Sequence, residues 1–370
     1  MSEVRVIHAR GAALARGQQI GRQLADLIQG SMDFYHRYLE RRGISSPRLH
    51  DLLTPYLVAA ETSFPEHMSV LKGMSVGATV PILELFAINA FEELEPQLQS
   101  PGGGLRFLQR KEGYARPPKP SMGERCSSLT VRTSEGRLLF AHNEHWLAGD
   151  LGNVAVVIDV PEAGRTPVAS PTIVCCLPAV GTNAFGGVQG IGSLTASDDG
   201  VGVPRVFVSR SSLASRNRED AIDRAGGVGR AGGYGHVFGF PGGDAFALET
   251  TGKQHRVIDG AGPHTNHYID PELAALAPEA SEGSQARYAR LARLLEERRP
   301  QTPEALMEIM RDHESAPQSI CLHPDPADGD EASAVMFSVV CDVDARRMWV
   351  AAGNPCETTY DEIDLTDVRI

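Results

Sequence analysis

The spacing of apolar residues divides the chain into a helical first part and a second part that consists mostly of strands. At 17–39 the apolar side chains recur every three to four residues, which is the period of a helix with one buried face. Three later stretches, at about 49–62, 65–74 and 82–94, have the same period. A short strand at 4–8 precedes them. The first part of the chain is therefore predicted to be mainly helical.

A hairpin opens the second part. Apolar and polar residues alternate at 127–133 and again at 137–143, and the Glu135-Gly136 pair between them is typical of a tight turn. Further strands are predicted at 153–160, 171–177, 235–240, 244–250, 255–259, 263–268, 319–322, 335–343 and 346–352, and helices at 203–213, 218–225, 284–298 and 303–313. Strands in two blocks separated by helices indicate an α+β fold, with two sheets and helices on their outer faces.

Between the two parts lies a stretch, 97–122, that is rich in proline, glycine and basic residues. It contains Pro101, three successive glycines and the Pro117-Pro118 pair, and such a composition is typical of an exposed linker. The linker ends just before Cys126. An ordinary inter-domain loop is the commoner explanation of such a stretch, but a linker that ends on a reactive residue also suggests a processing boundary.

Composition excludes several classes of function. Of 370 residues, 42% are hydrophobic and 22% charged, and the net charge is −12 without any block of basic residues. Nucleic acid and anionic membrane are therefore poor candidate partners. No apolar run approaches the ~20 residues of a membrane span, and the first residues lack the pattern of a signal peptide. Six cysteines are sparse for this length, which predicts reduced thiols in a cytoplasmic protein.

Cys126 is the first candidate for chemistry. It stands at the start of the first hairpin strand and is followed by Ser127 and Ser128. A cysteine in that place is held rigidly at a sheet edge, where a nucleophile is useful. A free cysteine is more often a small buried hydrophobe, so its surroundings decide between the two interpretations.

The other candidate sites are weaker. His264 and His267 are three residues apart on a predicted strand and therefore face opposite sides, which argues against a shared metal ion. Asn266 between them is a buried amide donor of the kind that stabilises an oxyanion. Glu249 ends an apolar strand and is either a solvated terminus or a buried orienting carboxylate. Glycines at 186, 187, 190 and 192 match no phosphate-binding fingerprint and are interpreted as turns that let strands approach closely.

Several stretches together resemble the isopenicillin N acyltransferase family of N-terminal-nucleophile hydrolases. They follow one another in the expected order along nearly the whole chain: ARGQQIG at 15–21, GMSVGA at 73–78, CSS at 126–128, NEHW at 143–146, Glu249, HTNH at 264–267, SIC at 319–321 and GNPC at 353–356.

The resemblance implies a four-layer αββα sandwich at 126–370, preceded by a mostly helical pro-segment at 1–125. It also implies that the precursor cleaves itself between Arg125 and Cys126, and that the two fragments remain bound to each other. Members of the family hydrolyse small amides or transfer acyl groups between amines and thioesters. Cys126 matches the nucleophile and Asn266 the oxyanion-hole amide.

The implied chemistry needs no cofactor and no metal. A thiol on the first residue of a cleaved subunit has its own α-amine as a base, with an ordinary pKa of about 7.7–8.0. Asn143 and His145 are expected to shape the site around that amine. The expected partner is a small N-acyl substrate, with an acyl thioester as a further donor.

Two positions depart from the family pattern: His145 stands where aspartate is common, and Leu322 stands where arginine often follows the SIC run. Both departures favour an alternative, a non-catalytic relative that keeps the fold as a small-molecule-binding or scaffolding protein.

Overall fold

Two β-sheets stacked face to face form the centre of the molecule. The computed structural model describes residues 3–98 and 126–369. One sheet has eight strands, in the order β1 (Val6–Gly11), β4 (Val154–Pro161), β5 (Val168–Ile173), β6 (Gly181–Asn183), β7 (Val188–Leu194), β8 (Gly233–Phe240), β9 (Asp244–Thr250) and β10 (His255–Asp259). The other has six, in the order β11 (Pro263–His264), β2 (Ser127–Arg132), β3 (Leu138–Leu147), β12 (Ser333–Asp342), β13 (Arg347–Ala352) and β14 (Asp361–Glu362).

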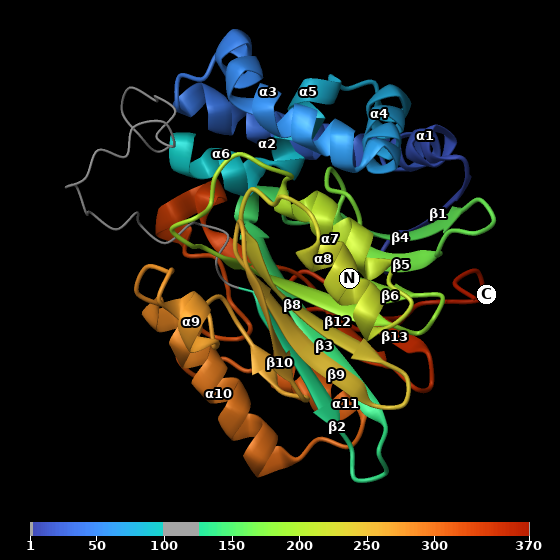
Figure 1. The fold of residues 1–370 in the computed structure, drawn as a ribbon, viewed down its shortest axis with the longest axis vertical. Helices are drawn as coiled ribbons and strands as arrows, with labels where there is room; N and C mark the ends of the chain where they lie inside the picture. The colour runs from blue at the N-terminus through green and yellow to red at the C-terminus, as the bar shows by residue number, and fades with distance from the viewer. Residues whose placement is uncertain (1–2, 99–125, 370) are drawn as a thin grey trace.

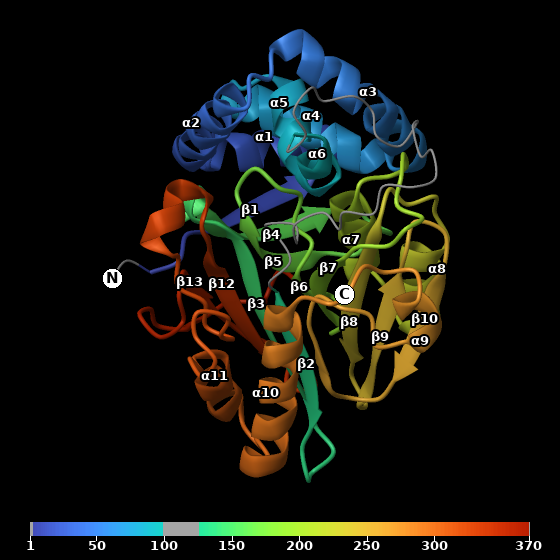
Figure 2. The ribbon, with the colours of Figure 1, turned by 90° about the vertical axis from the view of Figure 1, so that its left-hand side faces the viewer.

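Helices cover the outer face of each sheet. Helices α7 (Arg205–Leu213) and α8 (Arg218–Gly226) pack on the eight-stranded sheet, while α10 (Glu282–Arg298) and α11 (Pro303–Met310) pack on the six-stranded sheet. Figure 2 shows the four layers side by side, and a short helix, α9 (Pro271–Ala274), lies beside them. The fold is therefore the four-layer αββα sandwich that the resemblance implied, with a helical segment before it.

The N-terminal helices form a cap over one end of the sandwich (Figure 1). They are α1 (Ala13–Gln23), α2 (Ala25–Arg41), α3 (Ser46–Ser63), α4 (Pro65–Ala78), α5 (Ile82–Asn89) and α6 (Phe91–Leu98). The strand before them, β1, lies parallel to β4 in the eight-stranded sheet. The first part of the chain thus contributes a strand to the sandwich, and the division of the chain at residue 125 stays a prediction.

Helix α6 continues to Leu98, so the expected linker does not begin at Gln97, whose side chain is buried. The remainder of that linker and Arg125 lie outside the described residues. Within 3–98 and 126–369, every helix is too short or too polar to cross a lipid bilayer.

Close helix packing explains the glycines of two stretches noted above. Gly17 and Gly21 of α1 face Gly73 and Gly77 of α4, and a Cβ atom built on Gly17 would lie 1.9 Å from the carbonyl oxygen of Val70. Only glycine permits the two backbones to approach this closely.

A buried ion pair joins this helix pair to the sheet, because Arg16 Nε of α1 lies 2.6 Å from Asp159 Oδ1 of β4. Asp159 also accepts a hydrogen bond from Arg210 of α7, at 2.6 Å.

Strand β7 was missed from sequence because it contains Gly190 and Gly192, which were interpreted as turns. The expected close approach is present: a Cβ on Gly190 would lie 2.7 Å from Ser128 Oγ in the facing sheet. The other differences concern element boundaries and one expected strand that does not form. The helix expected at 17–39 is interrupted at Leu24, β11 is only two residues long, and 319–322 is not a strand.

Replacing Gly17 by alanine is expected to destabilise the protein by about 2 to 3 kcal/mol, because the new methyl group has to push the α4 backbone away. Gly30→Ala in α2 is a matched control, since its Cβ would meet only the side chain of Asn153, at 3.3 Å. Urea unfolding of both variants provides the measurement. Equal midpoints for the two would contradict the close α1–α4 contact.

Candidate active site

Pairing between β2 and β3 decides which side chains surround Cys126. Ser127 lies opposite Asn143 and Ser128 opposite His142, so Cys126, one residue earlier, lies beside Glu144. Successive residues of a strand point to opposite faces of the sheet. His142, Glu144 and Cys126 therefore face the other sheet, while residues 143 and 145 face α10 and α11.

Cys126 is buried, with an exposed fraction of 3%. Its Sγ lies 3.4 Å from Glu144 Oε1 and donates a hydrogen bond to it. Burial raises the pKa of the Cys126 thiol well above its usual value, and the Glu144 carboxylate raises it further. The thiol is therefore protonated at neutral pH and needs a neighbouring base to react.

Glu144 is the first member of a hydrogen-bonded chain. Its Oε2 lies 2.9 Å from His142 Nε2, and His142 Nδ1 lies 2.8 Å from Ser128 Oγ. One ligand atom each of Cys126, His142 and Glu144 lies within 4.8 Å of the others, a spacing that a metal ion also accepts. The hydrogen bonds from Cys126 to Glu144, between Glu144 and His142 and between His142 and Ser128 instead suit a relay of protons along the chain.

Asn143 and His145 do not line this site. Asn143 Nδ2 donates to the carbonyl oxygens of Met310 and Ile320, both at 3.0 Å, and His145 Nε2 lies 3.2 Å from the Ile320 oxygen. Both side chains therefore point away from Cys126, whereas the sequence predicts them beside it. The physical reason is the period of two in β3, which turns residues 143 and 145 away from the face that carries Glu144.

A buried guanidinium connects Asn266 to the nucleophile. Arg287 of α10 donates through Nη1 to the carbonyl oxygen of Cys126, at 2.6 Å, and through Nη2 to Asn266 Oδ1, at 3.1 Å. Asn266 Nδ2 donates to the Ser193 carbonyl at 3.3 Å, and its second N–H is a further donor. The structure thus brings Asn266 and Cys126 to the two sides of one arginine.

Glu249 is a buried orienting carboxylate, which decides between the two alternatives left by the sequence. Its oxygens accept hydrogen bonds from the backbone N–H groups of Ile269 (2.6 Å) and Asp270 (3.0 Å), and one of them lies 2.8 Å from His264 Nε2. His267 instead lies 2.8 Å from Ser284 Oγ. The two histidines face different partners, in agreement with the argument against a shared metal ion.

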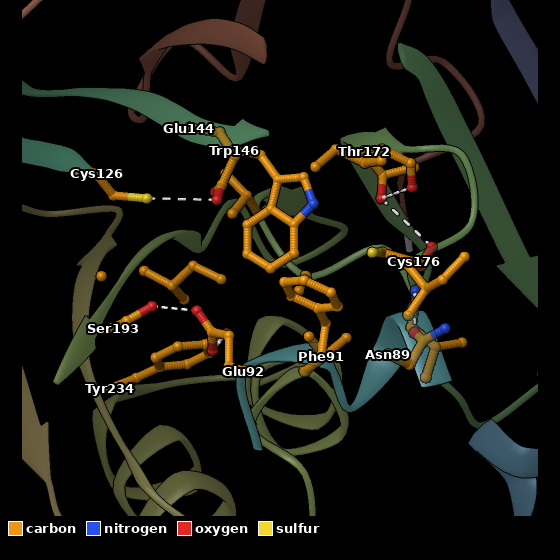
Figure 3. A pocket seen from close by; sticks show the side chains of 18 of the residues that line it. Asn89, Phe91, Glu92, Cys126, Glu144, Trp146, Thr172, Cys176, Ser193 and Tyr234 are labelled. Atoms are coloured by element: carbon orange, nitrogen blue, oxygen red, sulfur yellow. Dashed lines mark hydrogen bonds between the residues drawn. The ribbon is translucent and has the colours of Figure 1, made fainter. Parts of the chain in front are cut away.

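A cavity opens beside Cys126, between the cap of helices and the two sheets (Figure 3). Most of its wall is apolar and comes from both parts of the chain: Ile88, Phe91, Trp146, Ile173, Leu177, Val180, Ile191, Val206 and Phe337. Cys126 and Glu144 form one polar side, and Glu92, Ser193 and Tyr234 form another. Such a cavity accepts a small apolar group with a polar end.

Glu92 is the most unusual group in this wall. Ser193 Oγ and the Tyr234 hydroxyl, the latter at 2.6 Å, both donate to its carboxylate (Figure 3). Burial raises the pKa of Glu92 to about 7, although the Arg205 guanidinium opposes the rise. The cavity therefore contains a carboxyl group that changes its charge near neutral pH.

Three residues of the candidate site are not predicted from the sequence. Glu144 could have been found, because it shares the β3 face with His142 and pairs with the residue before Ser127. Arg287 and Glu92 carried no such signal, since each reaches the site from a helix distant in sequence.

Comparison with known proteins identifies relatives of the chain. The family model described as acyl-coenzyme A:6-aminopenicillanic acid acyl-transferase matches residues 131–357, more than half of the chain, beginning just after Cys126. A search of curated proteins found no match.

Solved structures with a similar fold include penicillin V acylase from Agrobacterium tumefaciens, with 14% identity, a TM-score of 0.45, and coverage of 66% of this chain and 88% of that one. They also include a variant of conjugated bile acid hydrolase from Clostridium perfringens, with 13% identity, a TM-score of 0.41, and coverage of 65% and 92%.

The raised pKa of Glu92 predicts a pH-dependent stability. A pKa that rises from 4.5 in the unfolded chain to about 7 in the folded protein stabilises the fold below pH 4.5, and this contribution is lost as the pH rises through 7. The full change is about 3 kcal/mol. Glu92→Gln is expected to remove it, so the variant should gain stability relative to wild type between pH 5 and 8.

Urea unfolding at several pH values measures the difference between variant and wild type. Glu61→Gln is the control, because that carboxylate is exposed and pairs with Lys72. If the Glu92→Gln and wild-type curves stay parallel across this pH range, Glu92 has an ordinary pKa.

Proposed function

The chain belongs to the acyl-coenzyme A:6-aminopenicillanic acid acyl-transferase family, and within it we propose a self-processing amide hydrolase or acyltransferase that uses the Cys126 thiol as nucleophile. The observation that carries this proposal is the Cys126–Glu144 hydrogen bond in the wall of a largely apolar cavity. A protonated thiol beside a carboxylate has the two groups that nucleophilic attack requires.

In the intact chain, Glu144 accepts the Cys126 proton while Sγ attacks the carbonyl carbon of residue 125. Glu144 then returns this proton to the Cys126 amide nitrogen, the bond between that nitrogen and the carbonyl carbon breaks so that it leaves as an amine, and a thioester joins residue 125 to the sulfur. Water then opens the thioester, which releases the carboxylate of residue 125 and a free thiol. His142 and Ser128 support Glu144 through the hydrogen bonds described above.

After cleavage, the new α-amine of Cys126 serves as the base for external substrates. The thiol gives its proton to this amine and attacks the acyl carbon of a small amide, whose C–N bond breaks as the substrate amine leaves with that proton. The resulting acyl-enzyme passes its acyl group to water or to another amine, which frees the thiol. Asn266 Nδ2 donates to the oxyanion, and Arg287 holds Asn266 in place through its Oδ1. The two cleavage fragments stay together, because the helical cap supplies part of the cavity wall.

The cavity supports a substrate with a small apolar acyl group. Its apolar wall suits the acyl chain, and Glu92 with its two hydroxyl partners suits a polar end of the substrate. An acyl thioester with the same acyl group is a second donor of this chemistry. The cytoplasm is the proposed location, because the six cysteines are all free thiols.

Wild-type protein is expected to split between Arg125 and Cys126 without an added protease, while Cys126→Ala stays whole. Glu144→Gln should slow the cleavage by about 100-fold or more, because an amide cannot accept the thiol proton. Intact-mass analysis of fresh and aged samples measures the rate. Glu135→Gln, in the exposed turn of the same hairpin, is the matched control. Cleavage of Glu144→Gln at the wild-type rate would exclude the proposed role of Glu144.

Asn266→Ala is expected to lower kcat by about 100- to 1,000-fold while leaving KM nearly unchanged, because the lost donor acts on the transition state. Steady-state kinetics on a panel of small N-acyl amides provides the test, with processed protein used throughout. A rise in KM at constant kcat would instead assign Asn266 to substrate binding.

A further inference from the structure

Four side chains with metal-binding chemistry gather outside the candidate active site. They are His313, Cys321, His323 and Cys356, and one ligand atom of each lies within 4.8 Å of those of the other three. They come from three segments: the turn after α11, the stretch before β12, and the turn after β13. The fold therefore brings Cys356 to a thiol and two imidazoles that lie between residues 313 and 323.

The distances between three pairs of these ligand atoms are close to those of a tetrahedral ligand set. The two sulfurs of Cys321 and Cys356 are 3.5 Å apart, His323 Nε2 lies 3.2 Å from Cys356 Sγ, and His313 Nε2 lies 3.1 Å from His323 Nε2. Tetrahedral zinc, with bonds of about 2.3 Å to sulfur and about 2.0–2.1 Å to nitrogen, holds its ligand atoms about 3.3–3.8 Å apart. A shift of a few tenths of an ångström brings each of these pairs to that spacing.

Polar groups of the kind found behind metal ligands lie next to two of these residues. Glu357 Oε1 lies 3.6 Å from His323 Nδ1, which leaves Nε2 of the same ring facing the cluster. Asn354 Nδ2 lies 3.7 Å from Cys321 Sγ and donates at 2.7 Å to the Leu322 carbonyl. A carboxylate behind a histidine ligand is a common way to fix the ring and its tautomer.

We propose that His313, Cys321, His323 and Cys356 form a structural zinc site. Two thiolates and two neutral imidazoles balance the charge of Zn²⁺, and the two thiol protons pass to solvent on binding. Protein atoms fill all four positions of the tetrahedron, so no position stays open for a substrate or an activated water. His313 and Cys356 are exposed, which gives the ion a path into the site.

A disulfide between Cys321 and Cys356 is the competing interpretation of the two sulfurs. It would give no role to the two imidazoles, which face the same point. The zinc site accounts for all four side chains.

Zinc at this position ties the turn after β13 to the segment that follows α11. The backbone oxygen of Ile320, the residue before Cys321, accepts hydrogen bonds from Asn143 and His145 on the face of β3 that is turned toward α10 and α11.

The zinc proposal is independent of the proposed catalytic function, because it is tested by measuring bound metal and not turnover.

The test uses the full chain with a tag that contains no histidine, purified under reducing conditions without chelators. Elemental analysis is expected to find about one zinc per chain. After chelation, added Co²⁺ should give the visible bands of a tetrahedral site and a thiolate-to-cobalt charge-transfer band. Bound zinc should also protect the exposed Cys356 from alkylation, and chelation should abolish that protection, as measured by peptide mapping.

Substitutions of the four side chains test whether they are the residues that bind the metal. Cys321→Ser with Cys356→Ser should reduce the zinc content at least tenfold, and His323→Ala should weaken cobalt binding. Cys126→Ala and His50→Ala are controls that should keep the metal, since the first removes the thiol of the other candidate cluster and the second an exposed histidine of α3.

Three results would overturn the proposal, and two of them come from wild-type protein, so they hold even where a variant fails to fold. One is reduced wild-type protein that binds neither zinc nor cobalt. Another is a Cys321–Cys356 disulfide in the isolated protein whose reduction yields no cobalt site. The third is metal that is lost from Cys126→Ala but kept by the double cysteine variant.

Discussion

The antiparallel pairing of β2 with β3 is the constraint on which the candidate site depends. With Ser127 opposite Asn143, the pleat directs Cys126 and Glu144 into the space between the sheets. A shift of one residue would exchange the two faces of β3 and put Asn143 where Glu144 now lies. The approach of the two sheets holds this register, because Gly190 leaves room for Ser128 and His142 between them. The reactive geometry is thus a consequence of sheet packing.

Burial then sets the charge state of the site. Cys126 lies where water is largely excluded, and the carboxylate of Glu144 further disfavours a second negative charge on the sulfur. The same burial raises the pKa of Glu92 on the opposite wall. Arg287 carries a positive charge nearby, but its guanidinium donates to the Cys126 carbonyl and to Asn266 and not to the sulfur. The intact chain therefore holds a neutral thiol next to a proton acceptor, an arrangement that avoids a buried thiolate because the proton leaves the sulfur only as it attacks.

Much of the fold could be predicted from the sequence because periodicity reports local structure. The helices of the cap and the first hairpin follow from it, and the four layers follow from the family resemblance. Strand β7 did not, because the glycines at 190 and 192 have no side chains to show alternation. Arg287 and Glu92 reach the site through tertiary packing of helices, which no local pattern records. In the sequence, the thiols at 321 and 356 stand out only as parts of family motifs. Their contact with His313 and His323 depends on how the turn after α11, the stretch before β12 and the turn after β13 come together in space.

His145 shows how the structure changes the meaning of a departure from the family pattern. As a residue beside the nucleophile, a histidine in place of aspartate favours the non-catalytic alternative. In the structure its side chain lies on the face of β3 that is turned toward α10 and α11, and its Nε2 lies 3.2 Å from the Ile320 carbonyl oxygen. A carbonyl oxygen only accepts hydrogen bonds, so the partner at 145 has to donate, which imidazole does and an ionised aspartate cannot. Histidine is therefore suited to this position for a structural reason. Its presence there no longer weighs against catalysis, since the carboxylate nearest the thiol is supplied by Glu144.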